Sequence, residues 1–177
     1  MNLYQQIANE HSKQNVIRVA AYIGGDKEKF DELMQIFFSD EKDMVKRAAW
    51  IMSHCADKYP HLIVPYIGQF VPLLKPEHPV WVRRNVARVL QLVNIPEELQ
   101  GEVVNTCFDI LLNPKDALAV QAFSMTILYN ITLEQPELKE ELILVIEDML
   151  PHGSAGIKSR GKKTIKALKK CKMYRRF

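Results

Sequence analysis

The chain has 177 residues, 47% of them hydrophobic, which is enough to bury a core in one domain or one short repeat array. No apolar run reaches the roughly 18 residues that a membrane-spanning helix needs, and the first residues do not form a secretion signal. The three cysteines, Cys55, Cys107 and Cys171, have neither metal-ligand spacing nor the pattern of a disulfide framework. We therefore expect a cytoplasmic protein with reduced thiols and no membrane partner.

The net charge of +3 conceals an uneven distribution along the sequence. Ten of the 24 lysines and arginines lie between Lys158 and Phe177, where there is no acidic residue, so the rest of the chain is acidic overall. Such asymmetry is typical of proteins that bind nucleic acid or an acidic partner.

Helical periodicity runs through the whole sequence, and no segment shows the alternation of strands joined by hairpin turns. Gly24 and Gly25 are expected to end the first helix, and seven of the nine prolines lie at predicted junctions. Pro65 fits the first turn of its helix, whereas Pro72 is expected to kink or end one. The predicted helices cover residues 14–23, 28–38, 43–57, 62–74, 79–93, 97–112, 116–131, 136–150 and 155–170.

A repeat of about 37 residues underlies these helices. Segments that begin at Ser39, Pro76, Pro114 and Pro151 align without a gap, at spacings of 37, 38 and 37 residues. Mostly apolar residues recur in the same register on both sides of an aligned β-branched position. A hairpin cannot bury its apolar face alone, so this periodicity predicts a stacked array. The aligned β-branched residues are Val45, Val82, Val120 and Ile157.

The period, the helix–turn–helix unit and the Pro or Asp at the turn within each repeat resemble HEAT repeats, which belong to the armadillo-like helical folds. The strings Arg47-Ala48-Ala49-Trp50 and His152-Gly153-Ser154-Ala155-Gly156 are similar to those of small bacterial HEAT-repeat proteins with no established activity. The resemblance implies one all-α domain over residues 1–177, a right-handed α-α superhelix (solenoid) of about four hairpins. The expected parts are an N-terminal helix or half repeat at 1–26, repeats at 27–61, 62–99, 100–138 and 139–170, and a basic tail at 171–177.

The second helices line the concave side of HEAT arrays, so their non-core positions form the predicted contact surface. Basic residues recur at these positions, and two aromatic residues interleave with them. We expect a non-catalytic scaffold that recognises a protein partner through this concave face. The candidate contact residues are Arg47, Trp50, His54, Arg84, Arg88, Tyr129, Lys158 and Lys162.

Two other functions use the same groove. A nucleic-acid-binding module would combine the basic groove with the basic C-terminal helix. The neutral inner positions of the third repeat, from Gln121 to Thr126, interrupt that basic stripe and favour a protein partner. A HEAT-like DNA glycosylase would use Trp50, but the matching second-helix positions offer no carboxylate to stabilise a departing base.

The loop from His152 to Ser159 resembles a phosphate loop but departs from the Gly-x4-Gly-Lys-Ser/Thr pattern, and Ser154 is expected to cap a helix there. A helix N-terminus beside basic residues could still hold an anion. The candidate anion-binding residues are Ser154, Gly156, Lys158 and Arg160. No His or Cys set has metal-ligand spacing and no nucleophile pattern occurs, so we expect no metal, no cofactor, no small-molecule ligand and no catalytic residue.

Overall fold

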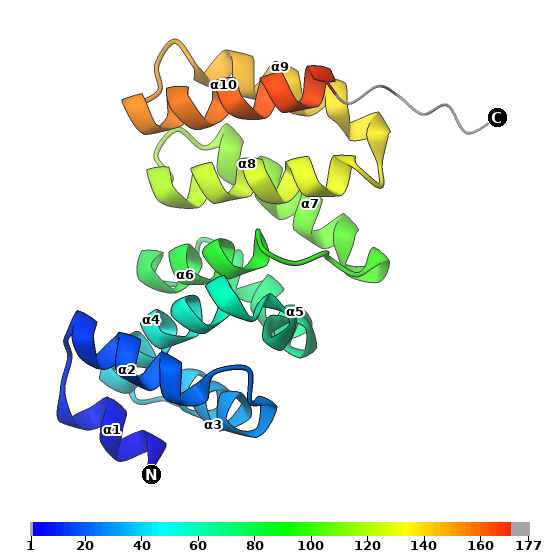
Figure 1. Cartoon of the computed structure of the whole chain (residues 1–177). Coiled ribbons are helices and arrows are strands. Elements are labelled where there is room, and N and C mark those ends of the chain that lie inside the picture. The colour runs from blue at the N-terminus through cyan, green and yellow to red at the C-terminus, as the bar shows by residue number, and fades with distance from the viewer. Residues whose placement is uncertain (1, 171–177) are drawn as a thin grey trace.

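A computed structural model of the chain describes residues 2–170, and all regular structure within this range is helical (Figure 1). The elements are α1 (Leu3–Asn9), α2 (Lys13–Ile23), α3 (Lys27–Phe37), α4 (Lys42–Lys58), η1 (Pro60–Tyr66), α5 (Ile67–Phe70), η2 (Val71–Leu74), α6 (Val80–Leu90), α7 (Glu97–Leu112), α8 (Leu118–Thr132), η3 (Pro136–Leu138), α9 (Lys139–Met149) and α10 (Ala155–Lys170). No helix in this range is long and apolar enough to cross a membrane.

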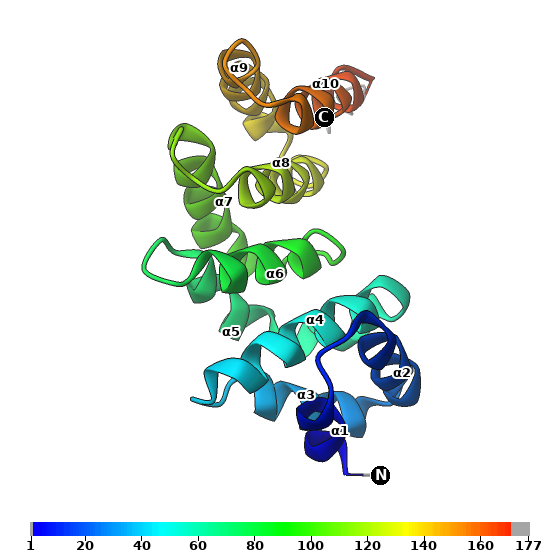
Figure 2. The same cartoon turned by 90° about the vertical axis from the view of Figure 1, so that its left-hand side faces the viewer.

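The helices stack in two layers. The second helices of the hairpins, α2, α4, α6, α8 and α10, pack against one another in chain order. The first helices form the other layer, and Figure 2 shows α7 and α9 on one side of the stack and α8 and α10 on the other. The stack is curved, with the second helices on the inner side of the curve. This arrangement confirms the predicted all-α HEAT-like solenoid.

The repeat register places the core as expected. Leu33 in α3 and Phe70 in α5 are aligned positions, and both are fully buried. Val120 and Ile157, aligned at the start of successive second helices, are also buried. Each hairpin therefore shares its apolar face with its neighbours along one continuous core.

The chain begins with a helix pair that the periodicity did not predict in full. Asn2 caps the short helix α1 by accepting a hydrogen bond from the Gln5 backbone N–H, and Leu3 and Ile7 bury its apolar side. α1 packs against α2, α3 and α4. Only seven residues long, α1 has too few turns for helical periodicity to be recognised in the sequence.

Residues 60–74 correct the sequence-based prediction of one regular helix. The segment is instead a 3-10 helix, one turn of α-helix and a second 3-10 helix. Pro65 lies inside η1 rather than in a first turn, and Pro72 lies in η2, so both remove a backbone donor that an α-helix requires. The segment depends on packing, with Ile63, Ile67 and Phe70 buried.

A buried ion pair joins the second repeat to the third. The Arg83 guanidinium in α6 donates to both Asp116 carboxylate oxygens, at 2.9 and 2.7 Å, and Asp116 lies in the turn between α7 and α8. The Arg83 Nε–H donates to the Leu74 carbonyl at the end of η2, at 2.8 Å. The two side chains are only 5% and 4% exposed. The pair thus fixes the start of α6 against the next hairpin.

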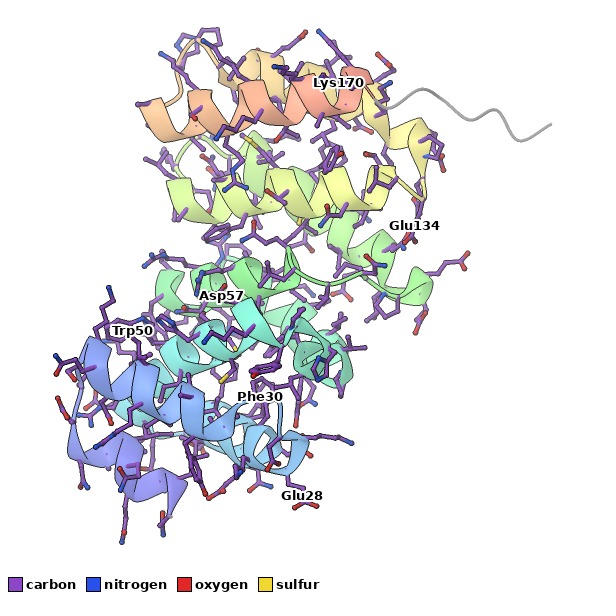
Figure 3. All side chains as sticks on the ribbon, viewed as in Figure 1. Glu28, Phe30, Trp50, Asp57, Glu134 and Lys170 are labelled. Carbon is purple, nitrogen blue, oxygen red and sulfur yellow. The ribbon has the colours of Figure 1, made fainter. Side chains whose placement is uncertain are left out.

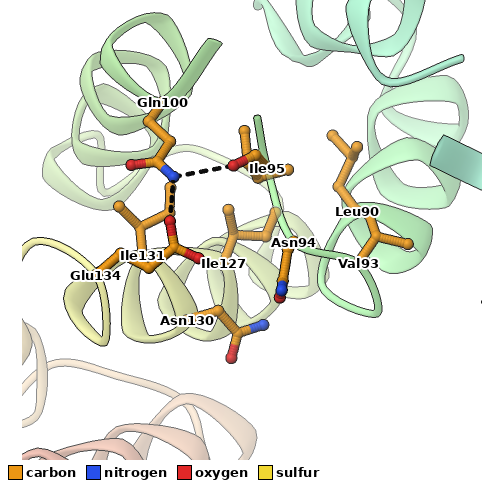
Figure 4. Close-up of a pocket in the computed structure, with 9 residues that line it drawn as sticks. All are labelled: Leu90, Val93, Asn94, Ile95, Gln100, Ile127, Asn130, Ile131 and Glu134. Atoms are coloured by element: carbon orange, nitrogen blue, oxygen red, sulfur yellow. Dashed lines mark hydrogen bonds between the residues drawn. The ribbon is translucent and has the colours of Figure 1, made fainter. Parts of the chain in front are cut away.

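A polar cluster forms a second joint, at the C-terminal end of α6 (Figure 4). The buried Gln100 side chain donates to the Ile95 carbonyl at 2.9 Å and to the Glu134 carboxylate at 2.7 Å. Asn130 in α8 donates to the Gln91 carbonyl at 3.0 Å. The Arg83–Asp116 ion pair forms the first joint, at the start of α6, and this cluster forms the second, at its end. Together they hold α6 in a fixed position relative to α8 and so fix the surface that the two helices share.

Candidate partner-binding surface

The two layers carry opposite charge. The five second helices contain 16 lysines and arginines and two aspartates, whereas α1, α3, α7 and α9 contain three lysines and 11 aspartates and glutamates. The uneven charge of the sequence is therefore not only a property of its C-terminal end. The fold separates basic from acidic residues, because the helices that carry most of the basic residues form the inner layer of the curve.

Helical register decides which second-helix residues are accessible. In α6 and α8 the positions one and five residues after the aligned apolar residue are buried, as Arg83, Ala87, Gln121 and Met125 show. In α4 the same positions differ, because Lys46 is exposed and Trp50 is half-buried. The positions two and nine residues after the aligned residue are exposed or half-buried. We name these accessible positions, together with Lys46, Arg88, Leu133, Lys163 and Lys170, the inner face. The last four lie four residues, about one helical turn, after an accessible position. The members of the inner face at the positions two and nine residues after the aligned residue are Arg47, His54, Arg84, Gln91, Ala122, Tyr129, Ser159 and Lys166.

Two of the predicted arginines lie on α6 in this inner face. Arg84 is exposed and has no hydrogen bond or ion pair with any residue of the described range. Arg88 is half-buried and pairs with Asp57 of α4 at 2.7 Å, beside α6 in Figure 3. Arg84 therefore offers a free cation to a partner, while Arg88 also holds two neighbouring helices together.

Arg47 has a structural role that the sequence did not reveal. Its guanidinium donates to the carbonyls of Ile7, at 2.9 Å, and Ala8 near the end of α1. Helix C-termini carry unpaired carbonyls and partial negative charge, so a cation there stabilises the helix. These bonds hold α1 against α4 and occupy Arg47, which leaves it with little to offer a partner.

An aromatic and cationic group surrounds Trp50, labelled in Figure 3. The Trp50 ring is half-buried, with its centroid 5.8 Å from the ring of His11 and 6.5 Å from the ring of His54. Next to it, the Lys46 ammonium lies 5.8 Å from the centre of the Trp81 ring. The structure adds His11, because the connection between α1 and α2 lies outside the repeat register.

The candidates in the last two hairpins fall into different places. Tyr129 is half-buried on α8, which contains no charged residue. Lys158 and Lys162 occupy the register of Arg83 and Ala87, which faces the next repeat, and they are exposed because no described repeat follows α10. The structure thus places these two lysines toward the end of the stack, and the inner face of α10 passes instead through Lys163 and Lys166.

The four anion candidates do not converge. Ser154 caps α10, as predicted, because its hydroxyl oxygen accepts from the Ile157 backbone N–H at 3.3 Å. Arg160 donates to the Thr126 hydroxyl of α8 at 2.5 Å, so its guanidinium is directed to the neighbouring repeat. Gly156 and Lys158 are exposed. The contacts of the loop are those of a helix start, and the anion site remains a prediction without structural support.

Gly153 is required by close packing of this loop. A Cβ at Gly153 would lie 2.7 Å from a methyl carbon of Ile157 and 3.1 Å from the Met149 carbonyl oxygen, which belongs to the backbone and cannot rotate away. We expect Gly153→Ala to lower the free energy of unfolding by about 1–3 kcal/mol. The control is Gly156→Ala, where the nearest atom is 3.8 Å away. Equal stability of the two variants in urea denaturation would contradict this account.

The cysteines in the described range are structural. Cys55 and Cys107 are buried free thiols, and burial raises the pKa of each to about 12. The reactive thiolate is therefore scarce at pH 8. Cys171 lies outside the described residues, so the test uses the Cys171→Ser variant. In this variant we expect the Cys55 and Cys107 thiols to react with a disulfide reagent only after the protein unfolds. Rapid labelling of the native protein at pH 8 would show that they are accessible and ionised.

Metal binding has no candidate in residues 2–170, because no group of three or more His, Cys, Asp or Glu side chains there is arranged to hold an ion.

The comparisons with known proteins agree with the fold. The family model of the HEAT repeat domain matches residues 3–168. The chain therefore belongs to the HEAT-repeat family, whose members are typically helical scaffolds for protein interaction. No curated protein matches it significantly.

Proposed function

We propose that the protein is a non-catalytic scaffold that binds a protein partner on the inner face of its second helices. The observation that carries this proposal is the segregation of charge, with 16 basic and two acidic residues in the second helices. A curved surface of one sign attracts a partner of the opposite sign and guides its approach. The first-helix layer would repel the same partner, so binding is directed to one side.

The centre of the inner face favours a protein over a nucleic acid. A nucleic-acid backbone carries a charge at every step, and cations along the groove supply most of its affinity. α8 has no charged residue, and Leu133, just beyond its end, is 56% exposed. Protein interfaces combine such an apolar centre with a polar and charged rim. The second helices carry only two carboxylates, Asp43 in the first turn of α4 and Asp57, which is paired with Arg88. A base-excising activity therefore gains little support from this surface.

The same proposal includes a reducing compartment, the cytoplasm, as the place of binding. Two cysteines of the described range are free thiols in the core rather than halves of a disulfide. Disulfides form and persist in oxidising compartments, so free buried thiols fit a reducing one.

A pair of charge reversals tests the proposal. Arg84→Glu on the inner face and Lys27→Glu on α3 change the net charge equally, and both residues are exposed. We expect Arg84→Glu to weaken binding of partners captured from the native cell at least tenfold, measured by quantitative affinity purification and titration. Lys27→Glu should bind like the wild type. Equal retention of the same partners by both variants, with folding confirmed by circular dichroism, would overturn the proposal.

A further inference from the structure

We propose that the inner face binds an extended acidic segment in which an apolar stretch separates two groups of carboxylates. This inference rests on the proposed function and adds the chemistry of the partner. It comes from the order of three zones along the second helices. The proximal basic zone consists of Lys46, Arg84 and Arg88. The apolar zone consists of Ala122, Tyr129 and Leu133. The distal basic zone consists of Lys163, Lys166 and Lys170.

The two basic zones offer cations for an acidic ligand. In the proximal zone, Arg84 is exposed and unpaired among the described residues, and Lys46 is exposed beside the Trp81 ring. In the distal zone all three lysines are exposed, and Lys170 is labelled at the end of α10 in Figure 3. Exposed cations in an acidic-depleted layer are complementary to carboxylates, which can accept hydrogen bonds from each of them.

The apolar zone between them selects against uniform negative charge. α8 presents half-buried Ala122 and Tyr129, and Leu133 follows its end. Near the middle of α8 the half-buried Arg160 contacts Thr126. Over Tyr129 and Leu133, toward the end of the helix, a carboxylate would lose water without gaining a cation, which is costly. An apolar side chain at the same place would gain from the removal of apolar surface from water. The zone order therefore predicts the order of residue types in the ligand.

Helix packing sets the length of the ligand. α6, α8 and α10 pack in succession, and the axes of packed helices lie about 8–10 Å apart. The proximal and distal zones are then separated by about 16–20 Å along the stack. An extended chain advances about 3.3–3.6 Å per residue, so about five or six residues span the apolar zone. With a carboxylate group at each end, the segment has about 12 residues.

Synthetic peptides test this order directly. The first probe has three glutamates, a six-residue middle of alternating leucine and serine, and three glutamates. The second has the same composition with all six glutamates at one end. We expect the first peptide to bind the full chain at least tenfold more tightly than the second in a fluorescence polarisation titration. A 12-nucleotide single strand of DNA is the third probe, and it should bind more weakly than the first peptide.

Matched variants assign the zones. Leu133→Ser in the apolar zone should weaken the first peptide about fivefold, because about 1 kcal/mol of apolar burial is lost. Leu144→Ser is its control, since Leu144 is 66% exposed but lies on α9 in the first-helix layer. Arg84→Glu and Lys163→Glu should each weaken the first peptide about tenfold, and Lys27→Glu should leave it unchanged.

Several outcomes would overturn the inference. They are equal binding of the two peptides, no binding of either, tighter binding of the DNA strand, or equal effects of Leu133→Ser and Leu144→Ser. Self-association that Arg84→Glu abolishes would make the acidic layer of a second copy the occupant instead. If native partners still depend on Arg84 while peptide order has no effect, this inference fails and the proposed function stands. If native partners ignore Arg84, the proposed function itself fails.

Discussion

Replacing Asp116 with alanine is expected to lower the free energy of unfolding by about 3–5 kcal/mol. The variant leaves the Arg83 guanidinium buried, with its two terminal nitrogens deprived of their carboxylate partner. A buried charge without a partner is far costlier than the loss of an exposed ion pair. Urea denaturation followed by circular dichroism measures the change.

Asp109→Ala supplies the matched control, because Asp109 is exposed on α7, the helix that precedes the Asp116 turn. Its effect should stay within about 0.5 kcal/mol. The double variant Arg83→Leu and Asp116→Leu removes both charges and should recover much of the lost stability. Similar losses for Asp116→Ala and Asp109→Ala would show that the buried pair does not stabilise the joint.

Phe70→Ala should lower the free energy of unfolding by a similar amount, about 3–5 kcal/mol. Phe70 is fully buried, and its ring meets Phe37 edge-on at 5.8 Å and Tyr66 at 6.2 Å. Residues 60–74 contain Pro65 and Pro72, so this segment has fewer regular backbone hydrogen bonds than a helix. Packing has to stabilise it instead, and hydrogen exchange should show that its amides lose the most protection.

Phe38 belongs to the same aromatic cluster, with its ring 5.8 Å from Phe70, but it is 37% exposed. Phe38→Ala should cost less than half as much, since less apolar surface is buried there. Equal losses for the two variants, or uniform loss of protection along the chain, would contradict the special dependence of residues 60–74 on aromatic packing.

The regular part of the fold could be predicted from the sequence because stacking imposes a register. Leu33 and Phe70 recur at one core position, and Val120 and Ile157 at another, and all four are buried. The irregular part could not be predicted in the same way. Pro72 indicated a kink, but the division of residues 60–74 into three short elements depends on how neighbouring helices pack around them.

The candidate site was predicted by layer but not by residue. Arg83 and Arg84 are neighbours of the same type, yet one is buried and paired and the other exposed. Each residue turns a helix by about 100°, so one step in sequence separates a joint from a contact surface. Arg47 differs for another reason, because its partners in α1 lie 40 and 39 residues away in the sequence. Such partners become visible only in three dimensions.

The segregation of charge was also partly hidden. The run of basic residues that begins at Lys158 is obvious in the sequence. Only the structure shows that the acidic helices α7 and α9 lie in the same layer, opposite the basic helices. The joints at the two ends of α6 then connect fold and function. They hold α6 against α8 and so fix the distance between the proximal basic zone and the apolar zone.

Site-directed photo-crosslinking in the native cell tests the central claim most directly. A photoreactive amino acid would replace Arg84, Tyr129 or Lys163 on the inner face and, in parallel, Lys27, Glu98 or Glu140 on the first-helix layer. We predict that the three inner positions crosslink to the same partner protein and that the three outer positions do not. Crosslinks to that partner from the outer positions alone, or equally from both layers, would contradict recognition by the inner face.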